Sequence, residues 1–301
     1  MMNWSNLFSD INFWISTIGS VLLGAISGMV GSISVLRKQS LIGDGIGHSV
    51  LPGIILSYMV FQSRSPLLLM LGAILFGLIS FGLIELFNLY SKTTLNTALA
   101  IVLSSMFGLG MVLKSNIQGN VKYQSASQAG LDKYIFGQAA FTSSGDVLLI
   151  VIVALINLCL LLAFRKELKL FVFDREFCAM AGFNPQLISI VVLISSLSLI
   201  SVGLRIVGAI LIASMLVAPT VAALQWTDRF YLVWLLSALF GGFSAFLGSV
   251  LATQGFPNGP VIIVMMTFFT LISFLLGKHG ALKKWWHRQT HKQALKKQVG
   301  E

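Results

Sequence analysis

Long apolar stretches separated by short polar segments dominate the chain. Nine of these stretches approach the roughly 20 residues that a helix needs to cross the hydrocarbon core of a bilayer. They lie at about 13–36, 44–61, 66–90, 94–113, 146–164, 186–203, 206–225, 230–252 and 259–277. The pattern predicts an all-α, polytopic membrane bundle of about eight or nine transmembrane helices.

The composition supports a membrane protein. Of the 301 residues, 56% are hydrophobic and 10% are charged, and the mean hydropathy is +0.89. A soluble protein of this size needs more polar residues to cover its surface. The net charge of +10 does not indicate a nucleic-acid partner, because the basic residues fall between apolar runs and at the C-terminus, not in one cluster.

The basic residues also predict sidedness. With nine spans, most Lys and Arg fall on the side that carries the C-terminal segment, and basic residues are retained on the cytoplasmic side. We therefore expect the N-terminus outside and the C-terminus inside. Residues 1–278 are expected to form the transmembrane domain and residues 279–301 a basic cytoplasmic tail. His287 and His291 of this tail stand among lysines and tryptophans, which favours a helix at an anionic lipid surface over a metal sensor.

Two features predict how the helices are arranged. Gly24, Gly28, Gly241, Gly242 and Gly248 lie within the apolar runs, and small residues let membrane helices approach closely. The segment 165–185 mixes charged and apolar residues and predicts a short amphipathic helix against the membrane or a partner, with a solvated loop as the alternative. Gly182 is expected to end this helix, and Pro185 to start the next span.

An acidic residue and a histidine occur together at the second span, in "SLIGDGIGHSVLPG". Ionisable residues are costly inside a membrane and call for a partner or a task. Asp44 and His48 are four positions apart and share one helix face. One interpretation is a hydrogen-bonded structural pair, and the other is a pair of metal ligands. His48 is the only histidine of the expected transmembrane region.

Two ligands are too few for a tight divalent metal site, which usually takes about four or more. A homodimer with a two-fold axis would bring two aspartates and two histidines together, in a site suited to manganese, zinc or ferrous iron. Glu85 and Arg205 are interpreted as charges at span ends. The sequence has no nucleotide-binding loop ending in Gly-Lys-Ser/Thr and no catalytic motif. We therefore expect a transport subunit and not an enzyme, and if the protein drives transport with ATP, another subunit must bind the nucleotide.

The segment "RKQSLIGDGIGHSVLPGIILS" resembles the signature of the metal-type ABC importer permeases, in which Gly-Asp is followed by His and then Leu-Pro-Gly. "FDREFCAMAGFNPQLI" and "PNGPVIIV" are similar to further segments of that family, so the resemblance covers about residues 15 to 278. Gly45 and Gly47 depart from the pattern, since the family more often has alanine and serine there. This departure predicts a looser start of the helix.

The resemblance implies a fold similar to that of type II ABC importer permeases in the bacterial cytoplasmic membrane. It implies a permease dimer, of one chain or of two paralogues, with two ATP-binding cassette ATPase subunits and an external metal-binding protein. The chain would hold no permanent cofactor and would transport a divalent metal, with manganese favoured over zinc and iron by "AGLDKYIFGQAAF".

By position, Asp44 and His48 match the metal ligands of the family, and Pro52 and Gly53 match the turn that shapes the pathway helix. The segment 174–185 matches the coupling helix that enters the ATPase. Within it, the residues matched to the ATPase contact are Glu176, Phe177, Ala181 and Gly182.

Two other functions are compatible with the residues. A proton-coupled secondary metal transporter would use Asp44 and His48 as a proton relay and would need no ATPase. A structural membrane partner subunit would need the pair only for packing. The segment 174–185 argues against the first alternative, because a proton-coupled carrier has no use for a docking helix.

Overall fold

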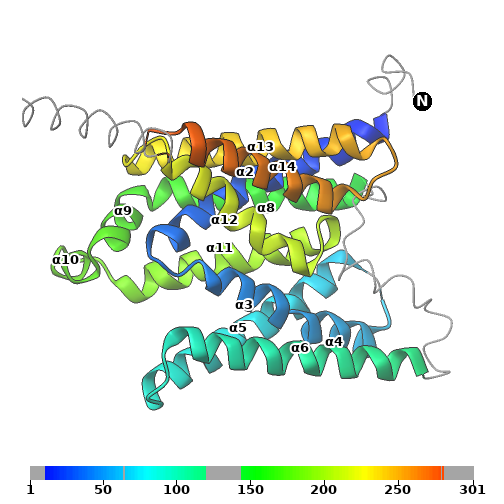
Figure 1. The fold of residues 1–301 in the computed structure, drawn as a ribbon. Helices are drawn as coiled ribbons and strands as arrows, with labels where there is room; N and C mark the ends of the chain where they lie inside the picture. Colours follow the sequence, from blue (N-terminus) through cyan, green and yellow to red (C-terminus); the bar gives the residue numbers. More distant parts are fainter. Residues whose placement is uncertain (1–10, 64, 120–143, 279, 281–301) are drawn as a thin grey trace, which may run out of the picture.

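A computed structural model describes residues 11–63, 65–119, 144–278 and 280 (Figure 1). Within these ranges all regular secondary structure is helical. The helices are α2 (Ile11–Leu36), α3 (Leu41–Ser49), α4 (Leu51–Phe61), α5 (Pro66–Tyr90), α6 (Leu95–Gly119), α8 (Ser144–Ala163), α9 (Arg165–Phe173), α10 (Arg175–Met180), α11 (Pro185–Ile206), α12 (Ala209–Leu224), α13 (Phe230–Ala252) and α14 (Asn258–Leu276).

The predicted polytopic helical bundle is confirmed. Eight helical segments in the described ranges are long and apolar enough to cross a membrane, with α3 and α4 together forming one of them. The seventh apolar run, 206–225, forms α12, which has only 16 residues and whose apolar part is shorter than the other spans. The chain passes back and forth, so that α2 begins at one end of the bundle and α14 finishes at the other, which is also the end where α9 and α10 lie (Figure 1).

The helices differ in how much of their surface the protein covers. About two thirds of the α3–α4 span and of α11 is buried (67% for each), whereas only 22% of α6 and of α14 is buried. The first two therefore lie inside the bundle and the last two at its periphery. Outward side chains such as Leu109 and Val264 are apolar and exposed, as expected for a surface that faces lipid.

The closest helix packing joins α2 to α13. A Cβ atom on Gly24 would lie 2.6 Å from the carbonyl oxygen of Gly241, and one on Gly28 would lie 2.5 Å from that of Ser237. These separations are shorter than real Cβ contacts, so the two backbones can approach this closely only at glycine. The prediction that these glycines pack helices together is confirmed.

The other two glycines of α13 behave differently from each other. A Cβ atom on Gly248 would lie 2.6 Å from the Cα atom of Ile262 on α14, so this glycine also permits close packing. A Cβ atom on Gly242 would make only ordinary contacts, the nearest at 3.6 Å. Close packing therefore does not require glycine at position 242.

The amphipathic segment 165–185 forms two helices and not one. The chain becomes extended at Asp174, whose side-chain oxygen accepts a hydrogen bond from the Phe177 backbone N–H at 2.9 Å. This cap starts α10 as a separate helix. Gly182 follows with φ of +86°, which favours glycine, and α11 begins at Pro185. The predicted helix end and the next helix start are both confirmed.

Candidate metal site and coupling segment

The helix that carries the candidate ligands is interrupted at Val50. Pro52 has no N–H to donate to the His48 carbonyl group, so the regular hydrogen-bond ladder is broken between α3 and α4. Val50 itself keeps helical dihedral angles, with φ of −78° and ψ of −14°. The Ser49 hydroxyl donates to the Gly45 carbonyl oxygen at 2.6 Å, a bond that bends helices. The span is therefore a helix with a local break directly after His48.

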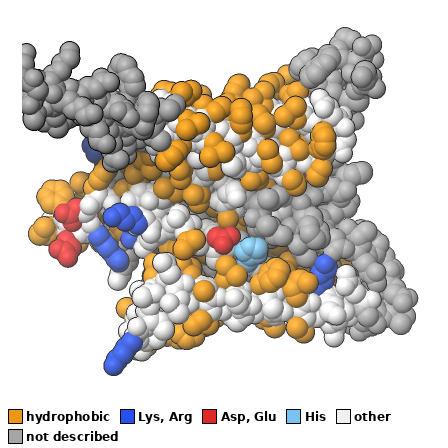
Figure 2. All heavy atoms as spheres, in the orientation of Figure 1, with side chains coloured by type: hydrophobic (Ala, Val, Ile, Leu, Met, Phe, Trp, Pro, Cys, Tyr) orange, Lys and Arg blue, Asp and Glu red, His pale blue; other side chains and the backbone are white. Residues whose placement is uncertain are grey.

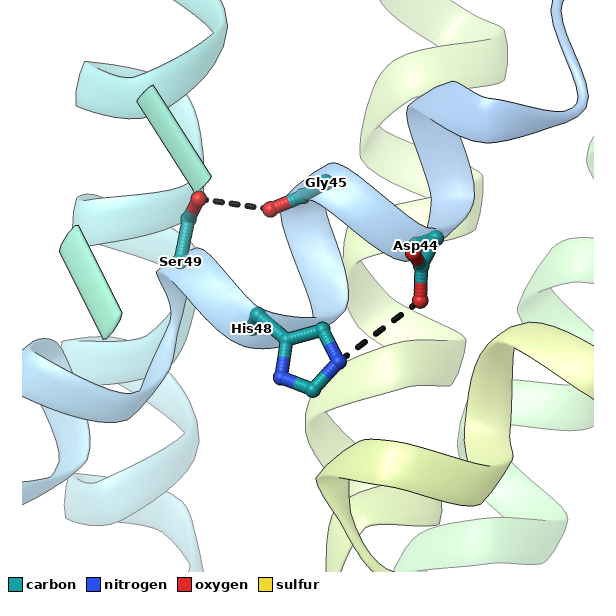
Figure 3. Close-up of polar contacts among 4 residues, drawn as sticks. All are labelled: Asp44, Gly45, His48 and Ser49. Carbon is teal, nitrogen blue, oxygen red and sulfur yellow. Dashed lines mark hydrogen bonds and ion pairs between the residues drawn. The ribbon is translucent and has the colours of Figure 1, made fainter. Parts of the chain in front are cut away.

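Asp44 and His48 project from the same side of α3, one turn apart (Figure 3). The distance from His48 Nε2 to Asp44 Oδ1 is 3.6 Å, as their spacing predicts. This distance exceeds that of a good hydrogen bond, so the carboxylate and the imidazole are close without being tightly bonded. A cation could enter between them without first breaking a short bond.

The two side chains differ in their surroundings. The His48 side chain is 17% exposed and the Asp44 side chain is 43% exposed. The His48 ring packs edge-on against Phe107 of α6, with the ring centroids 5.3 Å apart, and its Nδ1 atom is buried without a hydrogen-bond partner in the described chain. The ring is therefore held by packing, and neither nitrogen is committed to a short hydrogen bond.

The pair lies on the surface of the single chain. Figure 2 shows a histidine beside a carboxylate in an otherwise uncharged area, and His48 is the only histidine in the described residues. No group of three or more His, Cys, Asp or Glu side chains there is arranged to hold a metal ion. One chain thus offers two candidate ligands on an open face, and further ligands would have to come from outside the described part of the chain.

Pro52 and Gly53, the residues matched to the pathway turn, are buried at the start of α4. A Cβ atom on Gly53 would overlap the backbone of Gly72 on α5, and the reverse also holds. Gly53 therefore lets α4 and α5 touch backbone to backbone. Pro52 and Gly53 together determine the position of α4, the second half of the broken span, relative to α3 and α5.

The residues matched to the ATPase contact lie far from Asp44 and His48, at the end of the bundle where α9 and α10 protrude (Figure 1). Glu176, Ala181 and Gly182 are exposed, and Phe177 is 50% exposed. Met180, which the sequence interpretation did not single out, is 78% exposed. The structure therefore brings this group together on α10 and in the turn directly after it, separately from the candidate ligands.

The structure also shows a cavity that the sequence analysis missed. It has a volume of about 520 Å³ and lies behind α3, where Arg37, Glu85 and Arg175 line it. From its position in the sequence, Glu85 was expected to be only a charge at a span end. These three residues are far apart in the chain, and no motif or spacing connects them. The predictions for the tail, including His287 and His291, and for "GLDKYIFGQAAF" fall outside the described residues.

The fold defines a multi-pass membrane protein with an Asp–His pair on its surface and an exposed helical segment at one end. The model of the ABC 3 transport family matches residues 12–277. This chain belongs to that family, and the family resemblance seen in the sequence is confirmed.

Several relatives are similar over most of the chain. It is 41% identical to the zinc transport system membrane protein TroC of Treponema pallidum, with 94% of this chain and 95% of that protein covered. It is 36% identical to the manganese transport system membrane protein MntC of Bacillus subtilis, with 93% of this chain and 64% of that longer protein covered.

A solved structure has a similar fold. The structure of PsaBC from Streptococcus pneumoniae in complex with Fab matches with a TM-score of 0.81 and 26% sequence identity, over 91% of this chain and 95% of that one. The expected architecture of an ABC permease is thereby confirmed.

Proposed function

We propose that this protein is the membrane-spanning subunit of an ATP-driven importer of divalent transition-metal cations. The observation that carries the proposal is the Asp44–His48 pair, which sits on an open face of the bundle with its two side chains only 3.6 Å apart. The names of the relatives support a metal substrate, since TroC is a zinc and MntC a manganese transport system membrane protein.

The incomplete ligand set supports a dimer. Two copies facing each other across a two-fold axis would contribute two carboxylates and two imidazoles, enough for a divalent transition metal. Either a second copy or a paralogue could supply the other half. The negative charge of Asp44 would offset the loss of water from the cation. Because such a site is built from two halves, a change in the position of the subunits can open and close it.

Manganese is the predicted substrate, with zinc and ferrous iron as the alternatives. All three accept mixed oxygen and nitrogen ligands, and intrinsic affinity favours zinc over manganese in most sites. The external binding protein would then select the ion and deliver it to the outer side. The permease would provide a pathway that accepts the ion and releases it.

The ATPase subunit is expected to dock on α10. Phe177 and Met180 expose large apolar surfaces on a helix outside the bundle, where a lipid-facing role is less suitable than a protein contact. The same end carries most of the described Lys and Arg (Figure 2), and basic residues favour the cytoplasm. ATP-driven closure of two such subunits would push α10 and shift the spans.

The test is uptake of radioactive manganese by cells that express Asp44→Asn or His48→Ala. Losing a ligand from an already small set should reduce uptake by more than about tenfold, by analogy with changes around metal sites. Asp228→Asn, which changes a carboxylate distant in sequence between α12 and α13, serves as the matched control and should transport normally. Uptake at the parental rate in both site variants, with normal expression, would reject the ligand assignment.

The same assay separates the rival functions. A proton-coupled carrier would lose uptake on addition of an uncoupler and keep it when the ATPase subunit is deleted, and the importer should stop in the deletion strain. A structural subunit would tolerate an apolar pair in place of Asp44 and His48. Adding zinc or ferrous iron as competitors during manganese uptake then ranks the three ions.

A further inference from the structure

The cavity behind α3 combines a basic lining with an apolar, exposed rim. Its charged lining residues are Arg37, Arg175 and Glu85, so their formal charges leave an excess of one positive charge. Polar side chains add hydrogen-bond donors to the lining; they are Ser34, Gln39, Ser40, Asn88, Gln186 and Ser189. A volume of about 520 Å³ falls within the usual range for small-molecule sites.

No carboxylate neutralises the two arginines of the cavity through an ion pair. Neither forms an ion pair with any carboxylate among the described residues. Arg37 is half-buried, and its guanidinium lies over the Phe171 ring, 4.0 Å from the centroid. Burial and the nearby charge of Arg175 lower the pKa of Arg37, while Glu85 raises it. The guanidinium remains charged, so the cavity holds positive charge that is only partly compensated.

The position of the cavity suggests where a compensating anion would come from. Arg37 directly follows the last residue of α2, and Gln186 is the second residue of α11. Leu89 and Ile190, which also line the cavity, are 73% and 48% exposed. The cavity therefore lies at the level where these spans end, next to apolar side chains that face lipid. Basic pockets between helices at this level bind the headgroups of anionic lipids.

The cavity is distinct from the candidate metal site. Ile42, Gly43 and Ile46 of α3 line it, and at 100° per residue Asp44 and His48 lie on roughly the opposite side of that helix. A cation held by Asp44 and His48 would therefore not pass through the cavity. Its basic lining would also repel a cation.

We propose that this cavity binds the phosphate group of an anionic phospholipid from the surrounding leaflet, between Arg37 and Arg175. Guanidinium groups form strong paired hydrogen bonds with phosphate, and the acyl chains would leave along Leu89 and Ile190. A bound phosphate would join the turn between α2 and α3 to α10. The lipid would thus connect the segment proposed to contact the ATPase with the helix that carries Asp44.

The experiment is native mass spectrometry of the full-length protein in detergent, titrated with phosphatidylglycerol or with phosphatidylcholine. We expect the parental protein to retain phosphatidylglycerol in preference to phosphatidylcholine. Arg37→Gln and Arg175→Gln should each weaken this binding by about tenfold, the order expected for a lost hydrogen bond to a charged group. Lys38→Gln is the matched control, because Lys38 is an exposed neighbour of Arg37 that does not line the cavity, and it should bind normally.

Competition with inorganic phosphate decides the source of the ligand. If excess phosphate leaves lipid binding unchanged, the membrane is the source, as proposed. If phosphate displaces the lipid and stabilises the parental protein but not the arginine variants, the ligand is a soluble phosphate and the lipid assignment is wrong. Equal lipid binding by all four proteins would overturn the site. Should Arg37→Gln fail to fold, Arg175→Gln at an exposed position still decides the result.

Discussion

The consecutive helices α2 and α3 are both rich in glycine, yet their surroundings are opposite in kind. On α2, the backbone at Gly24 touches the backbone at Gly241 of α13. On α3, one side borders a cavity and the other carries Asp44, whose side chain is 43% exposed. A helix in backbone contact cannot shift without overlap, whereas a helix between a cavity and an open face can. These contacts, and not the composition, predict that α2 belongs to a fixed frame and that α3 is the helix better able to move.

The largest expected effect on stability comes from a substitution at the contact between α2 and α13. Gly24→Ala places a methyl group 2.6 Å from the Gly241 carbonyl oxygen, so the two helices must separate. We expect a loss of about 2–3 kcal/mol in the free energy of unfolding, typical of overpacking, measured by SDS titration in detergent micelles. A loss below the error of the measurement would show that the frame is not rigid.

The control for this substitution is Gly82→Ala on α5. A Cβ atom there would meet nothing within 4 Å, and alanine favours a helix over glycine by up to about 1 kcal/mol. We expect this variant to be as stable as the parental protein or slightly more stable. The pair of variants separates the close contact from the general effect of replacing glycine.

The second largest effect is expected at α10, the segment proposed to contact the ATPase and to drive the movement of the spans, α3 among them. Phe177→Ala removes a side chain that is 50% exposed, so stability should be unchanged. If α10 contacts the ATPase, the variant should lose about 2 kcal/mol of binding free energy, as a hot-spot aromatic does. Co-purification of the ATPase subunit and metal uptake both measure this loss.

Phe256→Ala provides the matched control for the coupling segment. Phe256 is 59% exposed and lies in the turn between α13 and α14, at the end of the bundle opposite α10 (Figure 1). It should leave binding of the ATPase unchanged. Equal losses in the two variants would mean that the effect comes from exposed aromatic surface in general and not from docking at α10.

The spans were predictable because the length of an apolar run directly reflects the thickness of the bilayer. The break at Val50 was indicated only by the family match of Pro52 and Gly53 to a turn, and the separation of α9 from α10 was not predicted. Each depends on one local feature, the missing N–H of Pro52 and the cap formed by Asp174, that a count of apolar residues does not detect. The short α12 shows the same limit, since its apolar run starts before the helix, which begins only after Gly208 with its φ of +94°.

The candidate site was predictable only in part, for a geometric reason. Asp44 and His48 lie within one helix, where the spacing alone fixes which residues share a face. Phe107, which packs on His48, comes from another helix, and the cavity joins Arg37 to the distant Arg175. Contacts between helices depend on their rotation and crossing, which the single sequence does not specify.

The smallest expected effect on stability comes from replacing a glycine of α3 by alanine. A Cβ atom on Gly45 would lie 2.9 Å from Cδ2 of Leu99, the end of a flexible side chain on α6, which can rotate away while the backbones stay in place. The gain in helix preference, up to about 1 kcal/mol, offsets the cost of that rotation. We therefore expect Gly45→Ala to unfold within about 1 kcal/mol of the parental protein, in the same SDS titration as Gly24→Ala. If Gly45→Ala were as unstable as Gly24→Ala, α3 would be held as firmly as α2, and movement of α3 could not open and close the proposed metal site.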